Sequence, residues 1–194
     1  MYKTFFLLHF LGAVLMFTAV GINLLSMIGM VLSKETKVVH LCSTWAVRMG
    51  KFLPFSIILL LISSFYMVFT KWGLELPWID ASFVMLIIFT VTSITIDLPR
   101  LKAINRVVKE EATSTPSFDL MAKSRDHVLW NSVSIMAMEV AAIIHIMIEK
   151  LGIAGSLITL VLALIIGLLY AKIILHLANK FNPTAAIRNK TVNF

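Results

Sequence analysis

The sequence contains few charged residues. Only 14% of its 194 residues are Asp, Glu, Lys or Arg, whereas 59% are hydrophobic. A soluble domain carries about 25% charged residues. The composition therefore excludes an ordinary soluble domain and predicts an integral membrane protein.

Cysteine is nearly absent, and so are the motifs of soluble enzymes. The one cysteine, Cys42, excludes an internal disulfide and a metal cage built from cysteines. The sequence has no glycine-rich phosphate loop and no HExxH zinc motif. No pair of hydrophobic runs is broken by glycine and proline at matching positions, as in many transporters. These absences argue against catalysis of the soluble type.

The sequence does contain five long hydrophobic runs. A helix needs about 20 apolar residues to cross a bilayer, and the runs cover residues 5–32, 52–70, 79–96, 128–148 and 153–178. They predict an all-α bundle of five transmembrane helices in a single domain, residues 1–194. Residues 98–127 are expected to form a partly helical cytoplasmic loop, with the third helix continuing beyond a kink at Pro99.

Lys and Arg are distributed unequally between the two predicted sides. Thirteen fall in the first loop, the third loop and the C-terminal tail, against only Lys3, Lys71 and Lys150 on the other side. The positive-inside rule then places the N-terminus outside and the C-terminus in the cytoplasm. The net charge of +7 thus serves orientation and contact with anionic lipid, and nucleic-acid binding is not expected. Trp72 and Trp78 are expected at the outer headgroups, and Trp130 at the inner boundary.

Two histidines lie inside the hydrophobic runs at similar depth near the outer face. Ionisable groups at such positions are functional candidates. His9 lies about four residues into the first run, and His145 about three residues before the fourth run ends. Each shares its helical face with two small residues and a methionine: Gly12, Ala13 and Met16 beside His9, and Ala142, Ala141 and Met138 beside His145.

These two faces predict a pocket for haem b with His9 and His145 as its axial ligands. A small residue such as Gly12 lets a flat macrocycle approach the backbone, and Met16 and Met138 can fill its apolar edge. Neutral imidazole is also the commonest metal ligand among side chains. The same pattern is typical of ordinary membrane helix packing, with each histidine reaching interfacial water.

Two carboxylates also fall within or beside the runs. Glu139 lies near the middle of the fourth run, where ionisation costs about 3 kcal/mol, so we expect it to be protonated or paired. It lies about 120° around the helix from His145 and is not part of the same ligand set. A proton relay, a redox-linked carboxylate and a structural hydrogen bond all remain open. Asp97 is expected to pair with Arg100.

Short motifs in the first half of the chain resemble a known family. They are residues 7–13 (LLHFLGA), 78–85 (WIDASFVM) and 98–101 (LPRL). They resemble a family of predicted bacterial integral membrane proteins of unknown function, itself distantly similar to CopD-like copper-resistance proteins and HemJ-type protoporphyrinogen oxidases. The resemblance implies a helical bundle in the bacterial cytoplasmic (inner) membrane with His9 as a haem ligand. The intramembrane lysine of HemJ-type proteins has no clear match, which argues against oxidase activity.

Three classes of function follow from these features. The first is a small membrane redox or haem-handling protein. The second is a non-catalytic interaction or assembly subunit, whose basic loops contact a membrane-protein partner or a second copy of the chain. The third is a metal-ion or proton permease that uses His9, Met16, Met138 and Glu139.

Overall fold

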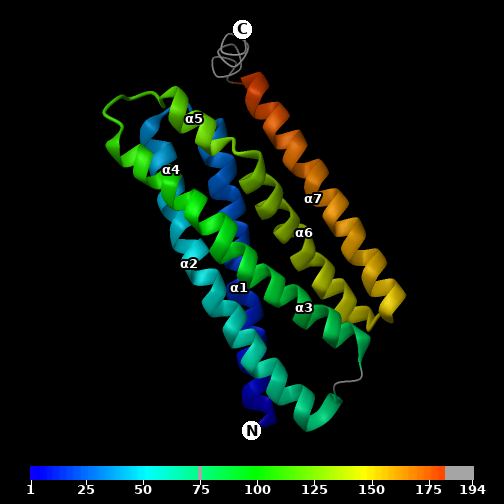
Figure 1. Ribbon diagram of the computed structural model, residues 1–194. Coiled ribbons are helices and arrows are strands. Elements are labelled where there is room, and N and C mark those ends of the chain that lie inside the picture. The colour runs from blue at the N-terminus through cyan, green and yellow to red at the C-terminus, as the bar shows by residue number, and fades with distance from the viewer. Residues whose placement is uncertain (74–75, 182–194) are drawn as a thin grey trace.

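The structure is a computed structural model that describes residues 1–73 and 76–181, and every regular element in these ranges is a helix (Figure 1). Two segments, η1 and η2, are π-helices that continue a preceding α-helix. In chain order the elements are α1 (Tyr2–Leu32), α2 (Thr36–Met67), η1 (Val68–Trp72), α3 (Pro77–Thr92), η2 (Ser93–Asp97), α4 (Leu98–Glu110), α5 (Phe118–Ser124), α6 (His127–Glu149) and α7 (Ile153–Phe181).

These elements form five helical rods; four are continuous, and the fourth in chain order is interrupted at Arg125 and Asp126, between α5 and α6. Each is long and apolar enough to cross a membrane: Tyr2–Leu32, Thr36–Trp72, Pro77–Glu110, Phe118–Glu149 and Ile153–Phe181. The prediction of an all-α bundle with five membrane-spanning helices is therefore confirmed. Arg188 and Lys190 of the C-terminal tail lie outside the described residues, and the orientation of the bundle stays a prediction.

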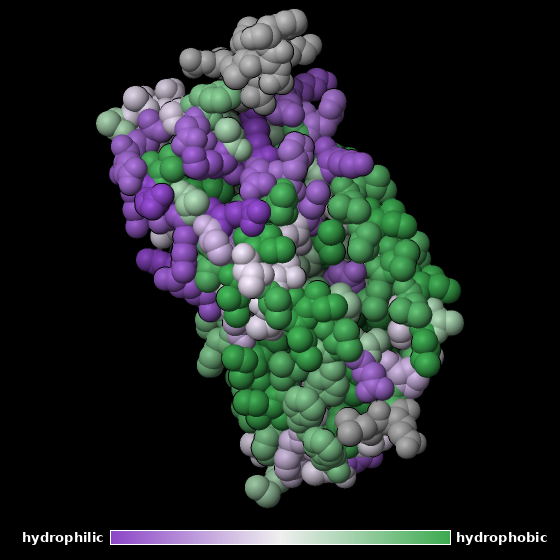
Figure 2. All heavy atoms as spheres, in the orientation of Figure 1, coloured by the Kyte–Doolittle hydropathy of each residue, from purple (hydrophilic) through white to green (hydrophobic). Residues whose placement is uncertain are grey.

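The two ends of the bundle differ in polarity. One end, called here the Trp end, carries Tyr2, Trp72, Trp78 and Lys150; the opposite end, called the basic end, carries α4, α5, the start of α2 and the end of α7. Figure 2 shows hydrophobic side chains over the middle and lower part of one face, with hydrophilic ones gathered over α4 and α5. This pattern suits a bundle that projects from the bilayer at its basic end.

The second rod is much longer than its hydrophobic run. It begins at Thr36 rather than at residue 52, so only Ser33–Glu35 separate α1 from α2. At 1.5 Å per residue, the 37 residues of this rod span about 55 Å, against about 30 Å of hydrocarbon. A search for apolar runs finds only the part inside the bilayer, because the remainder of the helix is polar on one side.

The third rod stays helical through Pro99. Proline has no backbone N–H and its ring crowds the preceding turn. Here the turn before it widens into η2, in which the Leu98 N–H donates to the carbonyl of Ser93, five residues earlier. The expected loop 98–127 is accordingly largely helical, because α4 and α5 account for residues 98–110 and 118–124.

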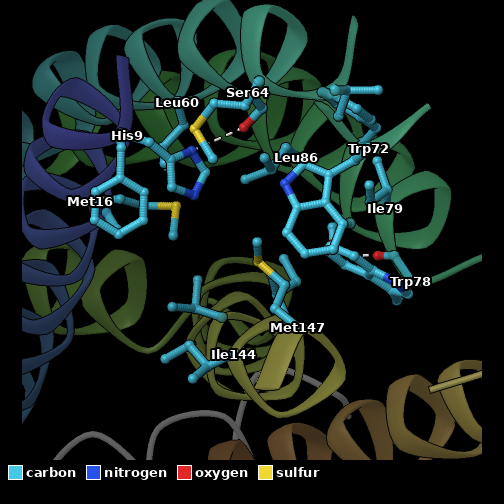
Figure 3. A pocket seen from close by; sticks show the side chains of 18 of the residues that line it. His9, Met16, Leu60, Ser64, Trp72, Trp78, Ile79, Leu86, Ile144 and Met147 are labelled. Atoms are coloured by element: carbon cyan, nitrogen blue, oxygen red, sulfur yellow. Dashed lines mark hydrogen bonds between the residues drawn. The ribbon is translucent and has the colours of Figure 1, made fainter. Parts of the chain in front are cut away.

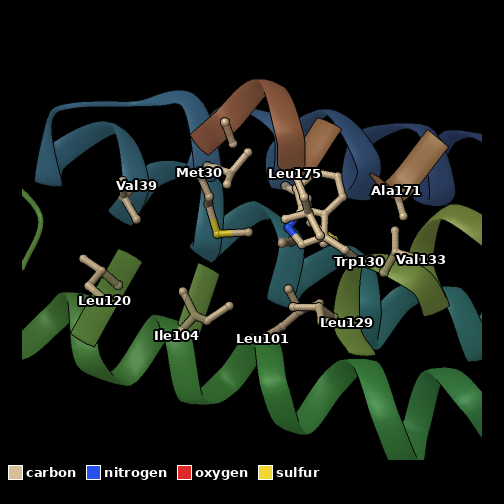
Figure 4. Packing of buried hydrophobic residues seen from close by; sticks show 14 of the residues in the cluster. Met30, Val39, Leu101, Ile104, Leu120, Leu129, Trp130, Val133, Ala171 and Leu175 are labelled. Carbon is tan, nitrogen blue, oxygen red and sulfur yellow. The ribbon is translucent and has the colours of Figure 1, made fainter. Parts of the chain in front are cut away.

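The main core lies toward the basic end, where α1, α2, α4, α6 and α7 meet (Figure 4). Trp130 is fully buried in it, and its indole Nε1 donates to the carbonyl of Ser124 at 2.9 Å. Its position at the inner membrane boundary stays a prediction, while its side chain faces the protein core. Its ring packs beside Leu175 and Val133. The indole can be buried there because its polar N–H has a backbone acceptor inside the protein.

Helices α6 and α7 approach each other very closely at Gly167. A Cβ atom there would lie 2.7 Å from the Cα atom of Ile135 and 3.0 Å from the carbonyl oxygen of Ser134. Membrane helices commonly use small residues to bring two backbones into contact. Gly167 therefore fixes the spacing of the last two rods.

Candidate functional site

A cavity of about 270 Å³ opens near the Trp end between α1, α2, η1, α3 and α6 (Figure 3). Its walls are mostly apolar, with Met16, Leu60, Leu86, Ile143 and Met147 among the lining side chains. Phe6 of α1 and Ile144 of α6 line it and are also exposed on the outside of the bundle. The cavity is therefore accessible from the apolar surface between these two helices.

His9 is the polar side chain that α1 places in the wall of this cavity. Its Nδ1 atom lies 2.9 Å from the hydroxyl oxygen of Ser64 on α2. The other ring nitrogen points into the cavity (Figure 3). With the proton on Nδ1, donated to α2, the Nε2 lone pair would be free to bind a metal or accept a hydrogen bond.

The structure brings Met16 to the same cavity but gives Gly12 another role. The thioether of Met16 lies on the His9 side of the cavity (Figure 3). A Cβ atom at Gly12 would lie 3.0 Å from Leu60 Cγ and 3.2 Å from the backbone nitrogen of Leu60. Gly12 thus lets α1 pack against α2, and this contact places His9 next to Ser64.

His145 and Met138 do not reach this cavity. Its lining residues on α6 include Val140, Ile143 and Met147, which follow each other at helical spacing. His145 lies two residues from Ile143 and from Met147, about 200° around the helix from each, and is exposed. The structure therefore does not bring His9 and His145 together, either for haem or for a metal ion held by both.

Several polar side chains in the bundle interior have oxygens without a hydrogen-bond partner among the described residues. Glu139 is 3% exposed and its Oε2 atom has no hydrogen bond with a described residue; the same holds for both carboxylate oxygens of Asp97 and for Asn23 Oδ1. Arg100 donates to Asp126 at 2.9 Å, so the expected pair of Asp97 with Arg100 is not formed. Glu139 does not line the cavity of His9, and the residues proposed for a permease are not assembled around one space.

Aromatic and cationic side chains surround the cavity at the Trp end. The rings of Trp72 and Trp78 meet edge to face with centroids 5.7 Å apart, and the ammonium of Lys150 lies 5.1 Å from the Trp72 ring centroid. Tyr2, Trp72, Trp78 and Lys150 all line the cavity. A bound molecule would therefore have an apolar body inside the bundle and could place an acidic group near Lys150.

Sequence reasoning did not identify the partner of His9 or the α6 side of the cavity. Neither Ser64 nor Met147 was singled out there. The spacing of His9 to Met16, two turns along α1, was the available signal for a shared wall. The sequence of α6 has no comparable feature that predicts which of its faces lines the cavity.

Metal ligation by protein groups alone has no support in the described part of the chain. No group of three or more His, Cys, Asp or Glu side chains there is arranged to hold a metal ion.

Comparisons with protein-family models, curated proteins and solved structures found no match to this chain. The geometry of the cavity is therefore the basis for a functional assignment.

Proposed function

We propose that this chain is a small multi-pass membrane protein that binds a planar, lipid-soluble redox cofactor in the cavity of His9. The proposal rests on the position of the two ring nitrogens of His9. One ring nitrogen is held by Ser64 on α2, and the other faces a cavity with mostly apolar walls. A partner on the first nitrogen fixes the orientation of a histidine ligand and raises its basicity.

The first candidate for the cofactor is haem b, which His9 would hold through its Nε2 atom. The donor set fits, because His9 supplies the nitrogen and the thioethers of Met16 and Met147 lie in the same cavity. Lys150 at the rim would neutralise a carboxylate of the cofactor. Haem b would supply one-electron redox chemistry, while the protein residues hold it, orient it and exclude water.

The second candidate is a quinone of the membrane pool. The volume of about 270 Å³ lies just below the ~300–1,000 Å³ of clefts that enclose drug-sized ligands. A cavity of this volume would enclose a single ring, whereas a macrocycle held by His9 would extend beyond it. His9 would then be a hydrogen-bond partner of a quinone oxygen, and the hydrocarbon tail would leave the bundle between α1 and α6.

We further propose that the Trp end faces outward and the basic end faces the cytoplasm of a bacterial cell. The described residues of the basic end include Lys34, Arg48, Lys102, Lys123 and Lys180, whereas Lys3, Lys71 and Lys150 belong to the Trp end. This asymmetry supports the positive-inside orientation. The cavity then opens in the outer leaflet.

The test is an absorption spectrum of the purified protein together with an analysis of its bound lipids. Protein purified in detergent after haem supplementation should show a reduced-minus-oxidised haem spectrum that His9→Ala abolishes. His145→Ala is the matched control and should retain the spectrum, because its imidazole is exposed and outside the cavity. Ser64→Ala should keep the haem but shift its midpoint potential, because the imidazole loses its anchor.

Each alternative has its own signature in the same experiment. Quinone enriched in organic extracts of the wild type, but not of His9→Ala, would identify the second candidate in place of haem. Loss of the spectrum in His145→Ala would contradict the assignment of His9 as the only histidine ligand. If neither haem nor quinone depends on His9, the cofactor proposal is wrong, and the assembly-subunit interpretation takes its place.

A further inference from the structure

A second hollow of about 510 Å³ lies between α2 and α4 at the basic end. Five of its lining residues are cations: Arg48, Lys51, Lys102, Arg106 and Lys109. None of its described lining residues is acidic. It is called here the basic groove, and it is separate from the cavity of His9.

The groove follows from matching patterns on two antiparallel helices. On α2, Thr44, Arg48 and Lys51 are spaced by four and three residues, and on α4 the same spacing relates Lys102, Arg106 and Lys109. Residues at this spacing share one helical face. Each helix therefore turns a basic stripe toward the groove.

The two stripes are held in place by buried contacts below them. Leu101, Ile104 and Val108 of α4 are almost fully buried in the main core. The amide of Asn105 donates to the hydroxyls of Ser43 and Thr44 at 3.0 and 3.1 Å. These contacts keep like charges on neighbouring helices close together, so the groove is a fixed feature of the fold.

The charges in the groove are not neutralised by the protein. Arg100 and Lys123 nearby are paired with Asp126 and Asp119, but none of the five groove cations forms an ion pair with a described residue. Like charges at this spacing repel each other. An anion in the groove would remove that repulsion and gain several charge-assisted hydrogen bonds.

The position of the groove along the bundle indicates where that anion comes from. Counting about 20 residues of membrane-spanning helix from Trp72 along α2 leads to Phe52, next to Lys51. Counting the same length from Trp78 along α3, η2 and α4 leads to Leu98, close to Lys102. The membrane-proximal end of the groove therefore lies at the level of the lipid phosphates, in the leaflet at the basic end.

The surface below the groove suits a hydrocarbon chain. The stripe of Arg48 and Lys51 continues along α2 through Phe55, Ile58 and Ile62, again at helical spacing, and these are 58%, 51% and 59% exposed. One face of α2 thus changes from cationic to apolar at headgroup depth. Figure 2 shows the same order on the visible face, with hydrophilic residues above hydrophobic ones.

From this arrangement we infer that the basic groove is a binding site for an anionic phospholipid. The phosphate lies between the α2 and α4 stripes, and an acyl chain lies along Phe55, Ile58 and Ile62. Basic pockets between membrane helices bind acidic headgroups through the same chemistry. A soluble phosphorylated molecule would use the cations but would leave the apolar part of the stripe uncovered.

Native mass spectrometry of the full chain in detergent, with equal amounts of phosphatidylglycerol and phosphatidylcholine, tests this inference. The wild type should retain phosphatidylglycerol preferentially. Arg48→Gln/Lys102→Gln/Arg106→Gln should lower its affinity at least ~10-fold, given the usual contribution of each basic residue near a lipid surface. Lys34→Gln/Lys37→Gln/Lys180→Gln, with the same loss of charge outside the groove, should behave like the wild type.

Two further samples keep the outcome interpretable. Lys102→Arg keeps the charge and should retain the preference, which separates loss of the site from loss of the fold. Glycerol 3-phosphate is the soluble probe, and if it binds as tightly as phosphatidylglycerol the site takes a free phosphate and the lipid assignment is wrong. A wild type without preference, or equal loss in groove and control variants, overturns the inference.

Discussion

The Glu111 side chain closes the connection between α4 and α5. Its carboxylate accepts hydrogen bonds from the Thr113 hydroxyl at 2.9 Å and from the Ser117 backbone N–H at 3.3 Å. Hydrogen bonding by Ser117, and then by Thr113, lowers the pKa of Glu111 below its ordinary value. Because the folded protein lowers this pKa, the stabilising effect is complete above the ordinary carboxyl pKa and disappears as the pH falls through the lowered one.

We therefore expect residues 111–117 to open on acidification before the helices do. Hydrogen exchange of the peptide between α4 and α5, corrected for the intrinsic pH dependence of exchange, should rise as Glu111 takes up a proton. Glu111→Gln should show fast exchange at every pH, and the neighbouring Glu110→Gln should behave like the wild type. An unchanged acid response in Glu111→Gln would contradict this account.

Single residues of the cavity could be predicted only in part. His9 and Met16 were identified because an ionisable group in a hydrophobic run is conspicuous and their spacing joins them on one face. His145 was equally conspicuous, but α6 is rotated so that this imidazole is exposed. The rotation of α6 is set by its packing against other helices, such as the close approach to α7 at Gly167, and the spacing of residues within α6 carries no information about that packing.

At the scale of the elements, the contact of α6 with α7 depends on the absence of a side chain at Gly167. A Cβ atom there would meet backbone atoms of Ile135 at 2.7 and 2.9 Å, which cannot rotate aside. We expect Gly167→Ala to lower the free energy of unfolding by about 1–3 kcal/mol, the usual cost of overpacking. Reversible unfolding of the wild type and of Gly167→Ala in mixed micelles measures this difference in the free energy of unfolding.

Gly21→Ala is the matched control for that experiment. A Cβ atom at Gly21 meets nothing within 4 Å, and alanine is the better helix former by roughly 0.5–1 kcal/mol. Its stability should be unchanged or slightly higher. Equal destabilisation by the two variants would show that the close approach of α6 and α7 is not what limits stability.

The elements themselves were largely predictable, but several of their boundaries were not. The apolar runs gave the number of spanning helices because a bilayer imposes a minimum length. They missed the start of α2 at Thr36 and the π-helical turn η2 that precedes Pro99. Both depend on tertiary packing, since buried contacts such as those of Val39 and Leu101 stabilise helix outside the hydrocarbon region.

At the scale of the whole molecule, the excess of Lys and Arg at one end predicts a single orientation. In a Cys42→Ser background, a cysteine replacing Glu149 at the Trp end should react with a membrane-impermeant maleimide on intact cells. A cysteine replacing Lys34 at the basic end should react only after the membrane is opened. Both positions are exposed in the bundle. The reverse pattern would invert the assignment of the two leaflets to the cavity and the basic groove.

The projecting basic end also restricts how copies of the chain can associate. Turning one copy over would carry α4, α5 and their Lys and Arg side chains through hydrocarbon, at about 2.5–3.5 kcal/mol for each charged residue. With this orientation we expect all copies in one membrane to point the same way, so that any rotation axis relating them is perpendicular to the membrane plane. A cyclic assembly is compatible with this expectation, whereas an antiparallel dimer and every dihedral arrangement are not.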